Sequence, residues 1–198
     1  MREHKQVSNE RKLEEMILFF SKMCEMDELF GSIRLNKLLF DADFSSYLVF
    51  GKSISGVEYF ALPQGPAPRI MKRVMTRMQT KGDLAIREKD SYGNLQKKPF
   101  ALRQPDPNVF TVAESNLMYE LLNQHWGKTG KRVSDESHEF LGWSASNLKE
   151  TIPYAVSLVS EREPTLDEIG RGLELATMAK ECLARNATRK TQAAHRRA

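Results

Sequence analysis

The chain has 198 residues, which is long enough for one well-buried core and short for two full domains. Charged residues make up 28% and hydrophobic residues 40%, a balance that excludes a disordered chain. No apolar run approaches the roughly 20 residues of a membrane-spanning helix, and the polar start MREHKQVSNERK lacks the apolar core of a secretory signal. We therefore expect a cytoplasmic protein without membrane contact.

The net charge of +4 is concentrated at the C-terminal end. Residues 185–198 contain five Lys or Arg side chains and no acid, so the remainder of the chain carries −1. We predict one domain over residues 1–184, followed by a basic flexible tail over residues 185–198. The tail is either a solvated terminus or an arm for nucleic acid or another acidic partner.

Apolar residues at helical spacing predict a first helix from about Asn9 to Met26 and a second that starts near Arg34 and stops at Gly51. Within the second helix, Lys37 and Asp41 lie four residues apart and can form an ion pair. The compact apolar stretch from Val57 to Leu62 then predicts a short strand between segments rich in glycine and proline.

A third helix is predicted from Pro66 to about Lys81, because proline is tolerated in a first helical turn and Gly82 supplies a stop. The sequence then alternates on both sides of Ser91-Tyr92-Gly93-Asn94, which predicts a β-hairpin. Together the third helix and the hairpin form a helix–hairpin unit over residues 66–101.

The second half of the chain is predicted to contain a helix from Thr111 to about Trp126 and a last helix from Thr165 to about Arg185. Between them we expect a polar loop, GKTGKRVSDES, a compact piece, HEFLGW, and a turn around Pro153. These elements indicate an α+β fold, a mainly helical single domain with a small antiparallel β-sheet or hairpin.

Several fragments resemble catalytic motifs without completing them. GKSISG lacks the spacing of the G-x-S-x-G nucleophile elbow, so Ser53 and Ser55 are interpreted as turn residues. The Gly127-Lys128-Thr129 segment lacks the first glycine of a P-loop, and His138-Glu139 lacks the second histidine of a zincin. We expect no enzyme, no catalytic residue and no cofactor.

Metal binding is not expected either. Asp41 and Asp43 are two apart on a helix, so they do not face each other, and we interpret them as solvated or ion-paired. Cys24 and Cys182 stand alone, without the spacing of a metal site. His138 either hydrogen-bonds nearby backbone or makes a functional contact, and the sequence leaves both open.

Basic residues on the helix–hairpin unit suggest an alternative function, a DNA-binding transcriptional repressor of winged-helix type. They are Lys72, Arg73, Arg77, Lys97 and Lys98. The near-neutral charge of the chain before residue 185 argues against this alternative.

Two blocks of sequence resemble the Panacea domain family, the SocA-like antitoxin and phage-associated proteins. The first block has the pattern K-L-L-x-x-A-D, an aromatic residue, Y-G-x-x-I-T-G-x-x-Y and P-x-G-P-V. Matching it are Lys37, Leu38, Leu39, Ala42, Asp43, Phe44, Tyr47, Gly51, Ile54, Gly56, Tyr59, Pro63, Gly65 and Pro66. The second block is matched by Ser137, His138, Trp143, Pro153 and Tyr154. Departures are Phe50, Ser55, Gln64 and Ala67, where tyrosine, threonine, histidine and valine are usual.

The resemblance covers most of residues 9 to 160 and implies an antitoxin that neutralises a separately encoded protein toxin by binding it. Some members of the family resemble adaptors that hand the toxin to a ClpXP-type protease. Inhibition by binding needs a complementary surface and no nucleophile or metal.

We expect the signature residues to form one spatial cluster where the two blocks meet, either to hold the fold or to contact the partner. They are Tyr47, Tyr59, Pro63, Gln64, Gly65, Pro66, His138 and Trp143, beside Lys37 and Asp43 of the first block. A hydrolase is the remaining rival, and it would need a site built from His138, Glu139 and Asp43.

Overall fold

The computed structural model describes residues 9–91 and 94–159, and all of residues 165–180 except 168, 175 and 179. Contacts divide the chain into two units, residues 1–159 and 160–198, and the elements below belong to the first. In the second unit, the described residues from 166 to 180 are helical, as predicted. The predicted tail and the domain boundary at residue 184 lie outside the described residues and stay predictions.

The first unit has a mainly helical α+β fold with small antiparallel sheets, which confirms the predicted fold class. Its first half contains α1 (Glu10–Met23), α2 (Ser32–Phe50), β1 (Tyr59–Phe60), β2 (Ala67–Pro68) and α3 (Met71–Lys81). Its second half contains β3 (Leu84–Ser91), β4 (Asn94–Ala101), η1 (Pro107–Val109), α4 (Val112–His125), α5 (Gly130–His138), α6 (Leu141–Ser144), β5 (Thr151–Ile152) and η2 (Tyr154–Leu158).

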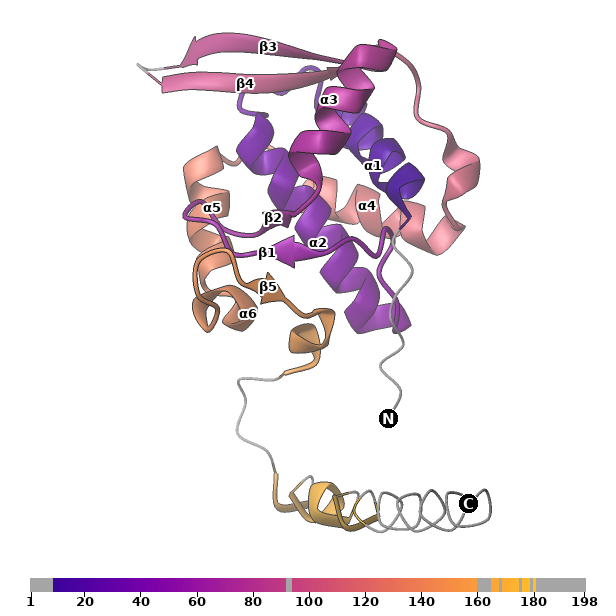
Figure 1. The fold of residues 1–198 in the computed structure, drawn as a ribbon, viewed down its shortest axis with the longest axis vertical. Helices are drawn as coiled ribbons and strands as arrows, with labels where there is room; N and C mark the ends of the chain where they lie inside the picture. The colour runs from indigo at the N-terminus through magenta and orange to yellow at the C-terminus, as the bar shows by residue number, and fades with distance from the viewer. Residues whose placement is uncertain are drawn as a thin grey trace, which may run out of the picture. The chain divides into compact units, whose positions relative to one another are not determined.

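Helix α2 crosses the middle of the first unit, and α1, α4, α5 and η2 all contact it (Figure 1). Its apolar side chains, such as Leu35, Leu38 and Leu39, are fully buried together with those of α1. Because helices cover α2 on several sides, polar side chains in its middle are also taken out of water. Lys37 and Asp43 are at most 1% exposed for this reason.

Two small sheets complete the first unit. The three-stranded sheet has the order β2-β1-β5 and is antiparallel, with Tyr59 opposite both Pro68 and Ile152. It joins the first signature block to the second. The other sheet is the predicted hairpin, in which β3 pairs with β4 from Leu84 opposite Ala101 to Ser91 opposite Asn94.

Both predicted glycine stops are confirmed. Gly51 and Gly82 follow α2 and α3 in the left-handed conformation, with φ of 71° and 76°, which glycine adopts without strain. The first helix ends three residues earlier than predicted, at Met23. There the chain turns, and Lys98 Nζ donates hydrogen bonds to the carbonyl oxygens of Glu25 and Asp27.

Three predicted boundaries are wrong. Helix α3 begins at Met71 rather than Pro66, because Ala67 and Pro68 pair with β1 and hold this segment extended. The predicted strand from Val57 to Leu62 is reduced to β1. The polar stretch GKTGKRVSDES is largely helical, since Thr129 caps α5 and the buried Val133 anchors it.

Among the helices in the part of the chain that the structure describes, none is long and apolar enough to cross a membrane.

Candidate functional site

The turn between β1 and β2 is formed by Pro63, Gln64, Gly65 and Pro66, here called the signature loop. Gly65 has φ of 92°, and its N–H donates to the carbonyl oxygen of Leu62 at 2.9 Å. A Cβ atom at Gly65 would lie 1.7 Å from Lys37 Nζ and 2.5 Å from Ser137 Oγ. Glycine is therefore required here both by the backbone conformation and by the close approach of two side chains.

Lys37 of α2 fixes the backbone of the signature loop. Its Nζ donates to the carbonyl oxygen of Gln64 at 2.5 Å, and Ser134 Oγ donates to the same oxygen at 3.1 Å. Burial lowers the pKa of Lys37 to about 8, against an opposing effect of the Asp41 charge, so the amine stays protonated at pH 7. The expected direct pair with Asp41 is not formed, because the Asp41 carboxylate lies 2.8 Å from His125 Nε2.

The second signature block fixes the residue just before the signature loop. Trp143 Nε1 donates to the carbonyl oxygen of Leu62 at 3.0 Å. The His138 ring stacks on the Trp143 indole with centroids 3.7 Å apart, in place of the backbone hydrogen bond considered for it. His138 Nε2 is buried without a hydrogen-bond partner among the described residues. Burial, followed by the nearby Lys37 charge, lowers the pKa of His138.

The signature loop is thus anchored by buried groups and exposed at its tip. The side chains of Pro63 and Gln64 are exposed, whereas Gly65 and Pro66 are buried. A pocket of about 270 Å³ lies beside the loop. Its walls are Ile33 and Asn36 of α2 and the segment Leu62–Ala67. We call Lys37, the signature loop, His138 and Trp143 the loop-tip cluster.

Asp43 belongs to a separate, fully buried group. Its carboxylate accepts hydrogen bonds from Ser55 N at 2.7 Å, Ser55 Oγ at 2.5 Å and Tyr59 OH at 2.8 Å. Burial raises the pKa of Asp43 to about 6, although the hydrogen bonds from Ser55 and Tyr59 lower it. The interpretation of Asp43 as a solvated or ion-paired side chain is wrong, because it ties α2 to the segment before β1.

Tyr47 lies near this group through Tyr154 of η2. The two tyrosine rings stack with centroids 5.6 Å apart, and Tyr154 OH donates to the carbonyl oxygen of Val57 at 2.6 Å. We call Asp43, Tyr47, Tyr59 and Tyr154 the carboxylate cluster. Every hydroxyl or carboxylate bond described in it connects elements of the fold, so it stabilises the domain.

The expected single cluster is therefore divided into two, linked by aromatic rings. Phe140 lies 5.2 Å from Phe40, and Phe40 lies 5.5 Å from Tyr59. Sequence reasoning missed Ser134, which anchors the signature loop, because it falls in the polar stretch that was predicted to be a loop. Val133 is the one large apolar residue in this stretch, so no apolar residues at helical spacing indicated a helix around Ser134.

The hydrolase rival gains no support from the geometry. Asp43 is held by Ser55 and Tyr59, while His138 stacks on Trp143, and no described hydrogen bond or ion pair joins either of them to Glu139. Across the described ranges, no three side chains of His, Cys, Asp or Glu gather as a metal site requires.

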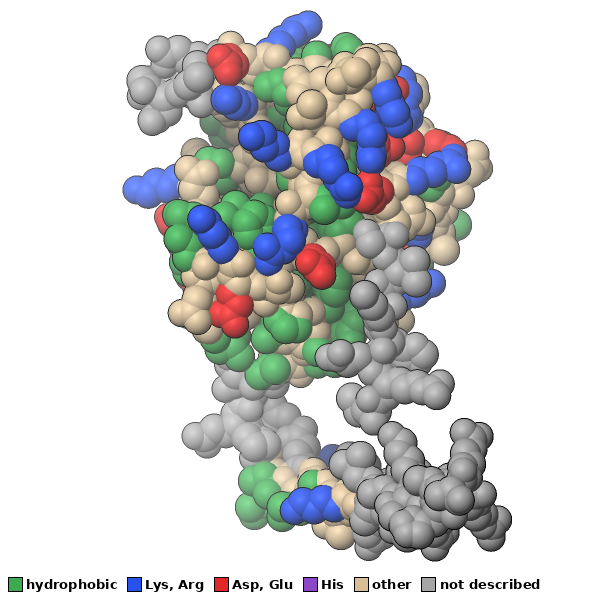
Figure 2. All heavy atoms as spheres, viewed as in Figure 1, with side chains coloured by type: hydrophobic (Ala, Val, Ile, Leu, Met, Phe, Trp, Pro, Cys, Tyr) green, Lys and Arg blue, Asp and Glu red, His purple; other side chains and the backbone are tan. Residues whose placement is uncertain are grey.

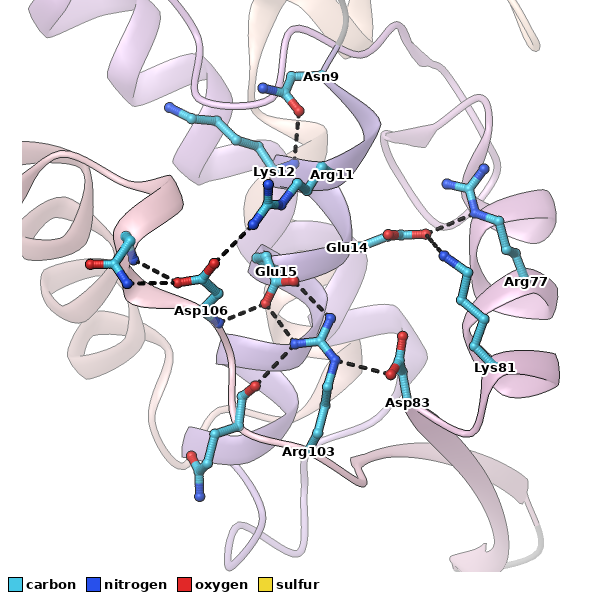
Figure 3. Close-up of polar contacts among 12 residues, drawn as sticks. Asn9, Arg11, Lys12, Glu14, Glu15, Arg77, Lys81, Asp83, Arg103 and Asp106 are labelled. Atoms are coloured by element: carbon cyan, nitrogen blue, oxygen red, sulfur yellow. Dashed lines mark hydrogen bonds and ion pairs between the residues drawn. The ribbon is translucent and has the colours of Figure 1, made fainter.

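The basic residues of the helix–hairpin unit are largely engaged inside the protein. On the face drawn in Figure 2, Lys and Arg side chains gather over α3 with acidic side chains among them. Figure 3 shows Arg77 and Lys81 of α3 turned toward Glu14 of α1, with Arg77 Nε 2.8 Å from Glu14 Oε1. Arg77 and Arg73 also pair with Glu10.

The two hairpin lysines considered for DNA binding are engaged as well. Lys98 is bound to backbone carbonyl oxygens, and Lys97 lies 3.5 Å from Glu88. These contacts reduce the positive charge available for DNA phosphates, so they give no support to the repressor alternative.

Comparison with known protein families identifies the family to which this domain belongs. The family described as antitoxin SocA-like, Panacea domain, matches residues 35–144. The chain belongs to this SocA-like Panacea family. The match runs from α2 to the end of α6, so it contains Lys37, Ser134 and Trp143, the side chains that anchor the signature loop. Comparisons with curated proteins and with solved structures gave no match.

Membership in the Panacea family indicates an antitoxin role and a protein toxin as the partner. The family resemblance stated from the sequence is thereby confirmed. Which residues contact the toxin is a separate question, and the two clusters suggest different answers to it. The carboxylate cluster is internal, while the loop-tip cluster ends in two exposed side chains.

Proposed function

We propose that this chain is a cytoplasmic antitoxin that neutralises a separately encoded toxin by direct binding, with the tip of the signature loop as part of the contact surface. The observation that carries the proposal is the contrast within the loop. Its backbone is fixed by donors from Lys37 and Ser134, and Trp143 fixes Leu62 just before it, yet Pro63 and Gln64 at its tip remain exposed.

A loop fixed in this way is suited to binding. Because its backbone is already ordered, it loses little conformational freedom when a partner docks. Gln64 offers an amide donor and acceptor, and Pro63 offers an apolar surface. The adjoining pocket of about 270 Å³ lies below the roughly 300–1,000 Å³ of small-molecule sites. Its size suits one side chain inserted by a protein partner.

The test is growth rescue with the toxin encoded beside this chain's gene. Wild-type antitoxin should restore growth when the two are co-expressed. Gln64→Arg adds length and charge at the exposed tip and should weaken toxin binding at least tenfold, as measured by calorimetry. Gln79→Arg makes the same change at an exposed glutamine on α3 and is the matched control, which should bind as wild type does.

Two outcomes would contradict the proposal in different places. If soluble wild-type protein fails to bind or neutralise the neighbouring toxin, the antitoxin function is wrong for this pair. If Gln64→Arg and Gln79→Arg both neutralise like wild type, the antitoxin function stands and the signature loop is not part of the contact surface.

The finer proposal is that the complex is handed to a ClpXP-type protease. Under this proposal, the half-life of the toxin falls when antitoxin and protease are both present, and deletion of the protease restores toxicity. Growth rescue with an unchanged toxin half-life would show neutralisation by blocking alone.

A further inference from the structure

The hairpin offers a second surface, the outer edge of β3. Within the residues that the structure describes, β3 pairs with β4 alone. Figure 1 shows β3 on the outer side of the hairpin. Strand β4 contacts α1 and α2, whereas β3 contacts α3, the helix that leads into it. Since an antiparallel strand uses only alternate residues to bond one neighbour, half of the backbone groups of β3 point away from β4.

Three observations establish which residues point outward. Pro99 stands opposite Ile86 and has no N–H, so this is a non-hydrogen-bonded pair. Two residues along, the carbonyl oxygen of Lys97 accepts from Ser32 Oγ at 2.9 Å and therefore points away from β3. The N–H of Leu102 donates to the carbonyl oxygen of Asp83 at 2.9 Å, which places the inward residues of β3 at odd numbers. Ile86 and Glu88 thus direct their N–H and C=O groups outward.

The two outer edges of the hairpin differ in how their backbone groups are protected. The outer edge of β4 lacks a donor at Pro99 and is capped by Ser32 at Lys97. The eight residues of β3, LAIREKDS, contain no proline or glycine, and no described side chain bonds to the outward backbone groups of Ile86 or Glu88. Natural proteins usually protect such an edge, since it is a template for strand addition.

The charge beside this edge favours an acidic partner. Arg87 is exposed, and its guanidinium lies over the Phe100 ring, 4.4 Å from the centroid. Among the described residues, Arg87 forms no ion pair, and the acid that its charge reaches, Glu25, is already paired with Lys22 at 2.7 Å. The neighbouring Glu88 is 3.5 Å from Lys97. The free charge at the edge is therefore positive.

We propose that the outer edge of β3 binds an extended segment of the toxin as an added strand, through the backbone groups of Ile86 and Glu88, with an acidic side chain of the toxin beside Arg87. This inference rests on the proposed antitoxin function and adds a contact distant in sequence from the signature loop. Backbone bonds of this kind supply affinity, and the side chains beside them supply specificity.

Amide hydrogen exchange of the full chain, alone and with the purified neighbouring toxin, tests the proposal. The amides of Ile86 and Glu88 should exchange fast in the free protein and at least tenfold more slowly in the complex. The amide of Arg87 faces β4 and should be protected in both states. If the complex forms and the exchange of Ile86 and Glu88 does not change, the edge is not a binding site, while the antitoxin function stands.

A pair of variants gives a second measurement. Glu88→Pro removes the outward N–H but no bond to β4, and Glu88→Ala removes the same side chain while keeping that N–H. We expect the proline variant to bind toxin at least tenfold more weakly than the alanine variant. Equal affinities would overturn the proposal, as would a second copy of this chain occupying the edge, seen as a dimer in free solution that the proline variant abolishes. If wild type binds no toxin, the function itself fails.

Discussion

The two buried tyrosine hydroxyls of the carboxylate cluster provide a quantitative prediction. Tyr59 OH donates to the Asp43 carboxylate at 2.8 Å, whereas the neighbouring Tyr154 OH donates to a neutral backbone carbonyl at 2.6 Å. Substitution of either tyrosine by phenylalanine removes one hydroxyl and the direct bond that it donates, and at Tyr154 it also removes an interaction with the nearby Asp43 carboxylate. The pair therefore compares a bond to a charged group with a bond to a neutral one, at adjacent rings 6.2 Å apart.

A hydrogen bond to a charged group contributes about 1.5–3 kcal/mol and a neutral one about 1 kcal/mol. At pH 8 we expect Tyr59→Phe to lower the free energy of unfolding by about 2–3 kcal/mol and Tyr154→Phe to lower it by about 1 kcal/mol. The difference also depends on pH, because Asp43 is ionised at pH 8 and largely protonated at pH 5, given its pKa of about 6.

The sign follows from linkage. The pKa of Asp43 is raised from 3.8 to about 6 in the folded protein, so its contribution to stability is present below pH 4 and is lost as the pH rises through 6. The Tyr59 donor stabilises the ionised form, which means that Tyr59→Phe costs most where that form is populated. At pH 5 its cost should fall to about 1 kcal/mol, close to that of Tyr154→Phe.

Urea unfolding followed by tryptophan fluorescence at pH 5 and pH 8 would measure these free energies. The reasoning is refuted if the two variants are equally destabilised at pH 8, or if the cost of Tyr59→Phe does not decrease toward pH 5. Unequal m-values between the variants would show a change in the unfolded state, and the free energies of such variants would not be compared.

Two further substitutions test the anchors. Gly65→Ala strains a backbone with φ of 92° and displaces the buried Lys37 amine, so we expect a loss of about 3–5 kcal/mol, against about 1 kcal/mol for Gly51→Ala, which has open space around it. Thermal melts would check this order, which equal losses would contradict. Arg103→Met leaves the Glu15 carboxylate, 5% exposed, without the donors at 2.7 and 3.0 Å shown in Figure 3. We expect a loss of about 2–3 kcal/mol that a second change, Glu15→Leu, largely restores. A loss below about 0.5 kcal/mol in the single variant would be inconsistent with a buried charge.

The sequence was sufficient to predict features that depend on residues close together along the chain. The stops at Gly51 and Gly82 and the hairpin turn are encoded within a few positions, so local rules were sufficient for them. The start of α3 could not be placed in this way. Ala67 and Pro68 are extended because they pair with β1, and a long-range pairing is not visible in the local pattern.

The partners of the buried charges were unpredictable for the same reason. Helical spacing placed Lys37 near Asp41, but Lys37 binds a carbonyl oxygen 27 residues away, and Asp41 binds His125 of α4. Asp43 lay on a helix that looked amphipathic, and only its covering by other elements shows that it is buried. The family signature contains Lys37 and Asp43, but a sequence pattern does not say which role each residue has.

The long range of these contacts also sets an order of events during synthesis. Trp143 reaches back 81 residues to Leu62, and Tyr154 reaches back 97 residues to Val57. At about 5–20 residues per second, a ribosome needs roughly 5–20 s to add that length of chain. During this time the signature loop lacks Ser134 and Trp143, two of the three side chains that fix it or the residue before it. Under the proposed function, the surface that binds the toxin is therefore completed late in translation, and a toxin translated at the same time meets a finished partner only after this delay.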